Sequence, residues 1–396
     1  MIVSTGMRLI EVKNDKKLAK EFIKLPARLY KNDPNWIRPI DKEVEDTFRP
    51  NVNSYFAHGK CTRWILQDAQ GQTIGRVAAF VNDQTANKGN KQPTGGMGFF
   101  DCINDQKAAF LLFDACKEWN QAQGMEAMDG PINFGNREKF WGLLTEGYIP
   151  QNYSMNYNAP YYKDLFEAYG FKDYFQQFTF GKKINEEFNP RLLNRAERII
   201  EQEEYTFKSL EMKHLDKYTN DLREIYNQAW ANHSGVDEMD AARAKATVAQ
   251  MKPILEEDLV WFGYHHNRPI GMFIMVPEVN QIFRYVNGKM NLLGKLKFLY
   301  HKKRGSVKQA LGLVFGVIPD FQGKGIETAL ATSWGQTHGW HDTYRYKYIE
   351  LNWIGDFNTT MVKMCRIFGF KVVKKHTTYR LLFDKDAPFE RAPVMK

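Results

Sequence analysis

Two glycines flank a lysine at the point where a strand pattern gives way to a helix pattern. Residues 311–318 follow a strand pattern, Gly323, Lys324 and Gly325 come next, and residues 327–335 begin a helix pattern. Glycines lack a Cβ and let backbone N–H groups converge, and the helix adds unpaired donors with about half a positive charge. Such a turn suits a pyrophosphate, and Lys324 adds a cation. The alternative is an ordinary glycine turn into a helix.

The elements around this turn repeat along the chain. Strand patterns alternate with helix patterns, which predicts an α/β protein with mixed, α+β type sheets. Residues 72–80 resemble residues 268–276, and Gly170-Phe171 recurs as Gly369-Phe370. A repeat of roughly 200 residues indicates duplicated domains, which we predict at residues 1–183 and 184–396. Residues 282–308, inside the second domain, form an insertion that is basic and apolar.

Bulk properties narrow the class of protein. The 396 residues carry a net charge of +9, and the four cysteines include no C-x-x-C pair. That spacing argues against a zinc site and against a disulfide framework, so no metal is expected. No signal-peptide pattern and no membrane-span pattern are visible, which predicts a cytoplasmic protein. The charge fits nucleic acid, an anionic cofactor or an anionic membrane, but no RNA-binding motif of the RRM or KH kind is present.

The glycine turn resembles the acyl-CoA-binding turn of the GNAT superfamily, V-x-P-x-x-[RQ]-x-x-G-x-[GA]. Val317, Pro319, Gln322 and Gly325 match this pattern, and Glu327 stands where the last Gly or Ala is usual. The resemblance implies that acetyl-CoA or a longer acyl-CoA binds in the second domain. The residues that it assigns to the cofactor are Val317, Ile318, Gln322, Gly323, Lys324, Gly325 and Ile326.

A second superfamily pattern, N-x-x-A-x-x-L-Y-x-x-x-G-F, follows the turn. Asn358, Met361, Met364, Cys365 and Gly369 keep its spacing. Cys365 occupies the slot of the tyrosine that often protonates the departing thiolate, so it is either the proton donor or a buried structural cysteine. Asn358 either contacts the cofactor or caps the next helix.

Longer stretches resemble one bacterial tandem-GNAT family, which includes the bacterial ceramide synthase. They lie at residues 25–30, 33–36, 75–79, 130–133, 142–148, 158–162, 226–230, 277–281 and 350–354. An acidic residue commonly follows the turn in this family, so Glu327 is a family trait. The resemblance implies an acyl-CoA donor and an amine acceptor, with a long-chain sphingoid base as one candidate.

Transfer to an amine requires a group that accepts a proton from it. Glu350, on a strand predicted at residues 348–353, is the first candidate for this general base. Its alternative role is a structural carboxylate paired with a lysine or arginine. The acceptor site is predicted to include Asn280, Gln281, Trp353 and Asn133. For Asn280 and Gln281 the alternative is a simple turn after a strand.

The first domain has no glycine turn, so we expect that it does not bind CoA. It either builds the acceptor pocket through loops such as residues 130–133, or is a degenerate domain kept for stability. The insertion at residues 282–308 holds eight lysines and arginines and no acid. It fits an interfacial segment on the anionic inner face of the membrane. The alternative is a solvated charged loop.

These observations predict an acyl-CoA-dependent N-acyltransferase with a hydrophobic or lipid-like amine as acceptor. Two other functions stay open. One is a catalytically silent acyl-CoA-binding regulatory or scaffold protein, which Cys365 in the tyrosine slot favours. The other is an aminoacyl-tRNA-dependent transferase, since such enzymes also use tandem GNAT domains, although they lack a good glycine turn.

Overall fold

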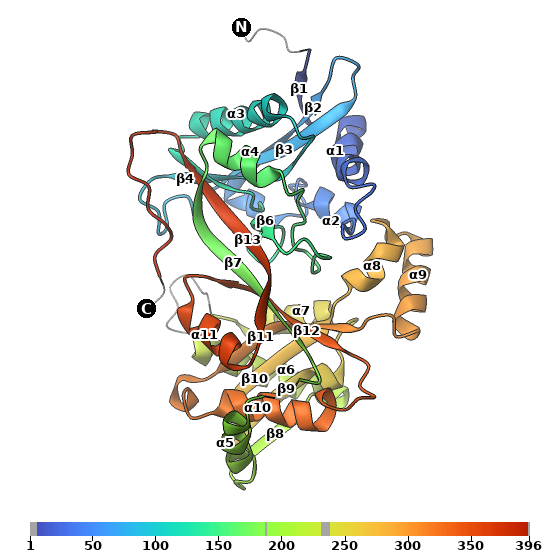
Figure 1. Cartoon of the computed structure of the whole chain (residues 1–396), viewed down its shortest axis with the longest axis vertical. Helices are drawn as coiled ribbons and strands as arrows, with labels where there is room; N and C mark the ends of the chain where they lie inside the picture. Colours follow the sequence, from blue (N-terminus) through green and yellow to red (C-terminus); the bar gives the residue numbers. More distant parts are fainter. Residues whose placement is uncertain (1–5, 187, 231–237, 395–396) are drawn as a thin grey trace.

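A single mixed sheet runs through the whole molecule. The computed structural model describes residues 6–186, 188–230 and 238–394. Its 13 strands follow the order β1-β2-β3-β4-β5-β13-β7-β12-β11-β10-β9-β8, and β6 pairs with β13 off this path. Figure 1 shows helices packed on both halves of the sheet. The predicted mixed α/β class is therefore confirmed.

The first half of the chain supplies one set of elements. Its strands are β1 (Arg8–Glu11), β2 (Gly59–Gln67), β3 (Thr73–Asn82), β4 (Thr94–Cys102), β5 (Ala127–Gly130), β6 (Leu143–Glu146) and β7 (Lys172–Lys183). Its helices are α1 (Lys16–Leu29), α2 (Asp41–Asp46), α3 (Gln106–Ala122) and α4 (Tyr162–Tyr169).

The second half repeats the pattern with an addition. Its strands are β8 (Tyr205–Ser209), β9 (Val260–His265), β10 (Arg268–Pro277), β11 (Gln309–Val317), β12 (Tyr348–Gly355) and β13 (Lys371–Leu382). Its helices are α5 (Pro190–Ile200), α6 (Leu215–Trp230), α7 (Ala241–Met251), α8 (Asn280–Val286), α9 (Leu292–Lys303), α10 (Ile326–Trp334) and α11 (Thr359–Ile367). The order β2-β3-β4-α3-β5-α4-β7 thus has its counterpart in β9-β10-β11-α10-β12-α11-β13, and α8 and α9 are the addition.

The two halves exchange their last strands. β7, the last strand of the first half, pairs with β12 of the second, whereas β13 pairs with β5 of the first half. β7 and β13 also pair with each other along the middle of the molecule (Figure 1). Each half-sheet is therefore completed by the other half of the chain. The boundary between residues 183 and 184 stays a prediction, and it falls where one exchanged strand ends.

Each half keeps a core of its own on either side of the shared strands. The first packs aromatic rings such as Phe100 and Phe113, whose centroids lie 4.7 Å apart, under α3 and α4. The second gathers aliphatic and aromatic side chains around α10, with Leu330 fully buried. Within the described part of the chain, no helix is both long and apolar enough to span a bilayer.

The basic insertion is helical. Residues 282–308 form most of α8 and all of α9, and Gln281 Oε1 accepts a hydrogen bond from Lys308 N (2.7 Å), which ties the two ends of the insertion together. At the tip, Asp41 N donates to Gly288 O (2.9 Å) and fixes the hairpin to the first half. The alternative of a solvated charged loop is thus corrected in one respect, because the segment is helical, although its lysines and arginines are exposed.

Candidate active site

β11 and β12 pair over only part of their length. Their parallel ladder runs from Gln309 opposite Tyr348 to Gly312 opposite Leu351 and stops there. β11 continues along β10 to Val317, while β12 follows β7 past an irregularity between Leu351 and Ile354. The two strands therefore part beyond Gly312, and the facing edge of β11 keeps backbone groups that no strand pairs. An extended ligand with amide groups could add to such an edge.

One backbone amide at the end of β11 points into this opening. Val317 lies opposite Gly271, and Ile318 N donates to Ile270 O (2.9 Å). In an antiparallel ladder this arrangement makes Val317 and Gly271 a non-hydrogen-bonded pair, so the Val317 N–H points away from β10. The Ile318 amide is engaged in the sheet, so of these two predicted cofactor residues only Val317 turns its backbone N–H toward the opening.

The turn after β11 needs glycine for its geometry. Gly323 and Gly325 have φ values of +70° and +93°, which side chains on L-residues rarely allow. A Cβ on Gly325 would lie 2.9 Å from Ile199 Cδ1 and 3.0 Å from Arg195 Nε, both on α5. Arg195 Nη2 also donates to Gly323 O (2.8 Å). α5 therefore holds the turn in place and brings a guanidinium beside it.

Glu327, in the first turn of α10, places its carboxylate at the same turn. Burial raises the pKa of this carboxyl, while hydrogen bonds from the Glu327 and Gly323 amides and the charge of Arg195 lower it, and the net shift is upward. These amides are the donors that a pyrophosphate would use. The acid therefore competes with a bound anion for the turn.

A buried ion pair lies beside the closed end of the parted strands. Glu350, on β12 opposite Leu311, pairs with Lys374 of β13, and both side chains are at most 2% exposed. Lys374 Nζ also donates to Asn152 Oδ1 (2.6 Å), which belongs to the first half. Glu350 thus forms an ion pair with a buried lysine, which was the alternative to its role as general base.

A second buried carboxylate, Glu278, follows β10 at the same place. Its backbone N–H donates to Gln309 O (2.9 Å), where the ladder between β11 and β12 begins. Its Oε1 accepts from Tyr153 N (3.0 Å) and Asn280 N (2.9 Å), and its Oε2 is buried with no partner among the described residues. Burial raises the pKa of Glu278 to about 7. A carboxylate of this kind is suited to exchange protons at neutral pH.

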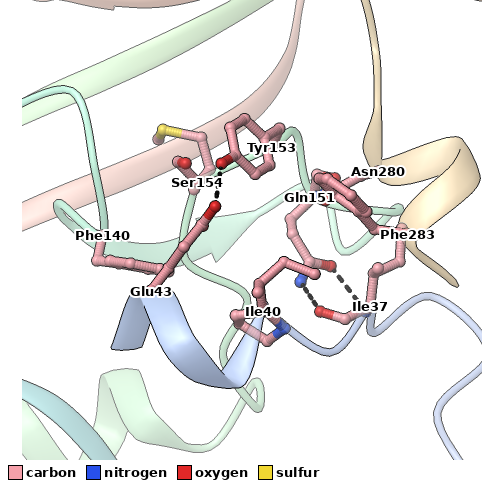
Figure 2. Close-up of a pocket in the computed structure, with 11 residues that line it drawn as sticks. Ile37, Ile40, Glu43, Phe140, Gln151, Tyr153, Ser154, Asn280 and Phe283 are labelled. Carbon is pink, nitrogen blue, oxygen red and sulfur yellow. Dashed lines mark hydrogen bonds between the residues drawn. The ribbon is translucent and has the colours of Figure 1, made fainter. Parts of the chain in front are cut away.

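Tyr153 and Asn280, whose backbone amides bind Glu278, line a pocket between the halves (Figure 2). Its walls are mostly apolar, and α8 of the second half contributes Asn280 and Phe283. Gln151 bridges Ile37 from the side, accepting from Ile37 N (3.1 Å) and donating to Ile37 O (2.6 Å), and Tyr153 Oη donates to Glu43 Oε1 (2.6 Å). The cavity is small, with about 10 Å³ of space open to water-sized groups, and the residues that line it are Ile37, Pro39, Ile40, Glu43, Phe140, Gln151, Tyr153, Ser154, Met155, Asn280 and Phe283.

Backbone strain gathers around this pocket and its larger neighbour. Phe99, Phe140 and Ser154 all have φ between +49° and +64°, and each lines one or both pockets. Such conformations cost on the order of 1 kcal/mol each and tend to persist at functional sites. The second pocket, about 50 Å³, shares Pro39, Phe140, Gln151 and Met155 with the first. Together they form a partly apolar space in the first half, which α8 of the second half closes on one side.

In the first half the equivalent parting of strands is filled by the chain itself. The β4–β5 ladder stops at Gly96 opposite Asp129, and Ile132 N then donates to Met97 O (2.8 Å). A Cβ on Gly98 would lie only 1.8 Å from Ile132 O, so the two backbones are in contact. A pantetheine arm has no room there, which supports the expectation that the first half does not bind CoA.

Comparison with known proteins finds relatives in sequence and in three-dimensional structure. No family model matches the chain. It is 26% identical to the bacterial ceramide synthase of Caulobacter vibrioides over 95% of this chain and 97% of the relative, and 26% identical to protein YghO of Escherichia coli over 93% of both. A tandem GNAT protein from the clavulanic acid biosynthesis pathway superposes over 97% of this chain and 100% of its own, with 10% identity and a TM-score of 0.53. The chain is therefore similar over most of its length to a relative named as a ceramide synthase, and it shares the tandem-GNAT fold.

In this tandem-GNAT protein the predicted cofactor residues have different roles. Lys324 is exposed over the Phe321 ring, 5.0 Å from its centroid, and is free to meet an anion. Gln322 Nε2 donates to Val317 O (2.9 Å), and Ile326 is fully buried, so both support the turn from within. Asn358 Oδ1 accepts from Met361 N (3.1 Å) and caps α11, as its structural alternative required.

Cys365 lies in the core of the second half. Its side chain is buried, and burial raises the pKa of the thiol to about 12. The thiol thus stays protonated at neutral pH but is a weak acid toward a thiolate. Its role as proton donor stays a prediction, and the described contacts are those of a core residue.

The four predicted acceptor residues do not form one cluster. Asn280 lines the pocket and its Nδ2 donates to Gln151 O (2.9 Å), whereas Gln281 binds Lys308 N. Trp353 is half-buried on β12 past the end of the ladder. Asn133 is buried in the first half with Oδ1 unpartnered among described residues. Glu278 and Lys374 were missed, although Glu278 lies in the family stretch at residues 277–281.

The Glu327→Gln variant should bind CoA several-fold more tightly than the natural protein, because a neutral amide no longer competes with the pyrophosphate. Lys324→Glu should weaken binding at least tenfold. Calorimetry with CoA measures both, and Lys88→Glu, an exposed charge reversal in the first half, is the control. Equal affinity in all three variants would place the CoA site elsewhere.

The Glu350→Gln variant should lose about 3–5 kcal/mol of unfolding free energy, because it leaves the buried Lys374 ammonium without its counter-charge. Adding Lys374→Met should recover most of that loss. Urea unfolding measures both. The control is Glu146→Gln, which breaks the more exposed ion pair between Glu146 of β6 and Lys375, the neighbour of Lys374 on β13. This change should cost at most about 1 kcal/mol. A loss for Glu350→Gln no greater than this control would contradict a tight buried pair.

Proposed function

We propose that the protein transfers an acyl group from acyl-CoA to the nitrogen of a hydrophobic amine. The observation that carries this proposal is the parting of β11 from β12 directly before the two-glycine turn. This parting places an unpaired strand edge directly before an anion site at the turn. Both features are needed to hold a nucleotide-linked thioester in an extended form.

The unpaired edge leads from the turn to the buried carboxylates. Five residue steps separate Val317 from Gly312, which is about 16 Å along a strand. With the pyrophosphate at the turn, the thioester lies near Gly312, beside Glu350 and Glu278. The Val317 amide and its neighbours on the edge would hold the pantetheine amides.

We propose Glu278 in place of Glu350 as the group that receives the amine proton. Its Oε2 has no partner among the described residues, and its pKa of about 7 lets it accept a proton at neutral pH. The amine nitrogen then attacks the thioester carbon, its proton passes to Glu278, and the C–S bond breaks to release CoA thiolate. The Glu350–Lys374 pair acts as a positioning element behind it.

The acceptor is proposed to bind in the pocket between the halves. The apolar side chains in its walls would contact a hydrocarbon chain, and the Glu43 carboxylate in the wall would attract an ammonium group toward Glu278, which lies behind Tyr153 and Asn280. The relative named bacterial ceramide synthase makes a long-chain sphingoid base a reasonable acceptor. A lipid amine would come from a membrane, so peripheral contact of residues 282–308 with anionic lipid belongs to the same proposal.

Thiol release tests the reaction. The protein is incubated with acetyl-CoA or palmitoyl-CoA, with and without sphinganine dispersed in detergent, and free CoA is followed. Release that depends on the amine, together with an N-acyl product, supports the transferase. CoA binding without turnover on any amine supports a silent acyl-CoA sensor instead, which buried Cys365 and the acid at the turn favour. Absence of CoA binding would overturn the site.

The Glu278→Gln variant should lower kcat/KM by about 10²–10⁴-fold and remove the rise of activity with pH near 7, because the base must be ionised to act. The rate–pH profile of the amine-dependent reaction measures this. Glu203→Gln, which changes an exposed carboxyl in the turn between α5 and β8, is the control. A profile that keeps its rise near pH 7 in Glu278→Gln would assign the base to another residue.

The same variant has a readout that needs no substrate. The folded protein holds the Glu278 proton more tightly than the unfolded chain does, because its pKa is raised from 4.5 to about 7. Stability contributed by this group is therefore lost as pH rises from about 5 to about 8, by up to about 3 kcal/mol. Unfolding of Glu278→Gln measured over this range should lack that loss.

A further inference from the structure

α9 turns one face to the protein and leaves another uncovered. Gly294, Phe298 and His301 pack inward: Phe298 meets Phe283 of α8 at 5.5 Å between ring centroids, and His301 stacks on Tyr285 at 3.9 Å. At 100° per residue these three positions share an arc of about 60°. The rest of the helix surface is free to meet something else.

The uncovered face is apolar. Leu292 is 76% exposed and Leu299 is 59% exposed, and the other large apolar side chains of this face are also more than half exposed. The members of this leucine face are Leu292, Leu293, Leu296, Leu299 and Tyr300. They share an arc of about 120°, on the side of α9 away from the packed residues. Large apolar groups gathered this way mark an interaction surface.

Cations border the leucine face on both sides. By the same rotation, Lys295 and Lys302 lie on one flank, Lys297 and Arg304 on the other, and Lys303 falls within the face at its C-terminal end. All eight lysines and arginines of residues 282–308 are exposed, and none forms an ion pair with a described residue. A second copy of the chain would bring like charges together, and nucleic acid would leave the leucines in water. An apolar stripe between two cationic flanks matches an anionic lipid surface.

The packed face of α9 leads to the acceptor pocket. Phe298 contacts Phe283, which lines the pocket and lies 5.4 Å from the Tyr153 ring. The hairpin of α8 and α9 projects at the edge of the molecule between its two halves (Figure 1). A lipid surface on the leucine face would therefore lie one helix layer from the pocket in Figure 2.

We infer that the leucine face of α9 docks the protein on an anionic membrane and sets the acceptor pocket toward the bilayer. Docking stands on the charge and apolar pattern of α9 alone. The delivery of an amine from that bilayer rests on the proposed function. The two parts fail separately, because binding to vesicles requires no acyl transfer.

Sedimentation with vesicles tests the docking. The full chain should bind vesicles of phosphatidylglycerol mixed with phosphatidylcholine, bind pure phosphatidylcholine at least tenfold more weakly, and release as salt is raised. The Leu296→Asn/Leu299→Asn double variant should lose at least tenfold in affinity for the anionic vesicles. The control is Val52→Asn, which removes an exposed apolar side chain from the first half and should bind unchanged.

The results for membrane docking and for acyl transfer can be interpreted separately. Equal vesicle binding by the leucine variant, or no binding by the natural chain, overturns the inference, as does a dimer that the leucine variant disrupts. Thiol release with detergent-dispersed sphinganine should be unchanged in the leucine variant, whereas release with sphinganine embedded in anionic vesicles should fall at least tenfold. If detergent-dispersed amine gives no release in either protein, the proposed function fails while vesicle binding still decides the docking.

Discussion

The exchange of β7 and β13 is the constraint on which the rest of the structure depends. Each half-sheet ends in a strand from the other half, so neither half can close its sheet alone. The exchanged β7 lies between β13 and β12, so Lys374 reaches Glu350 across it, and Lys374 Nζ also donates to Asn152 of the first half. Taking two charges out of water is costly, and the hydrogen bond to Asn152 helps to offset that cost for Lys374.

Duplication followed by divergence explains why one opening remains. Both halves part their central parallel strands after a short ladder, at Gly96 in the first and Gly312 in the second. In the first half the backbone at Ile132 fills the gap and the space beyond it becomes a lined pocket. In the second half the gap leads to the glycine turn. The second half is thus suited to an extended anionic ligand, and the first half is suited to an apolar ligand.

Local patterns explain what the sequence could predict. The strand before Gly323, the helix after Gly325 and the cap at Asn358 depend on neighbours in the chain, so periodicity and residue type reveal them. Glu278 and Lys374 could not be found in this way, because their burial and their partners are set by segments more than a hundred residues distant. The same holds for the Ile318 amide, whose engagement depends on the register with β10.

The acid at the turn has a physical logic once these parts are combined. A glycine turn at a free helix N-terminus can bind many anions. Because the Glu327 carboxylate occupies the same amides, a ligand must bind strongly enough to displace it. In the proposed function, acyl-CoA brings more than its pyrophosphate, since its pantetheine arm would add to the edge of β11 as far as Gly312. A simple phosphate lacks those contacts and gains little by displacing the carboxylate. We infer that Glu327 lowers the affinity of the turn for anions in general and so makes it selective for acyl-CoA. The guanidinium of Arg195, which lies at the same turn, stabilises the displaced carboxylate.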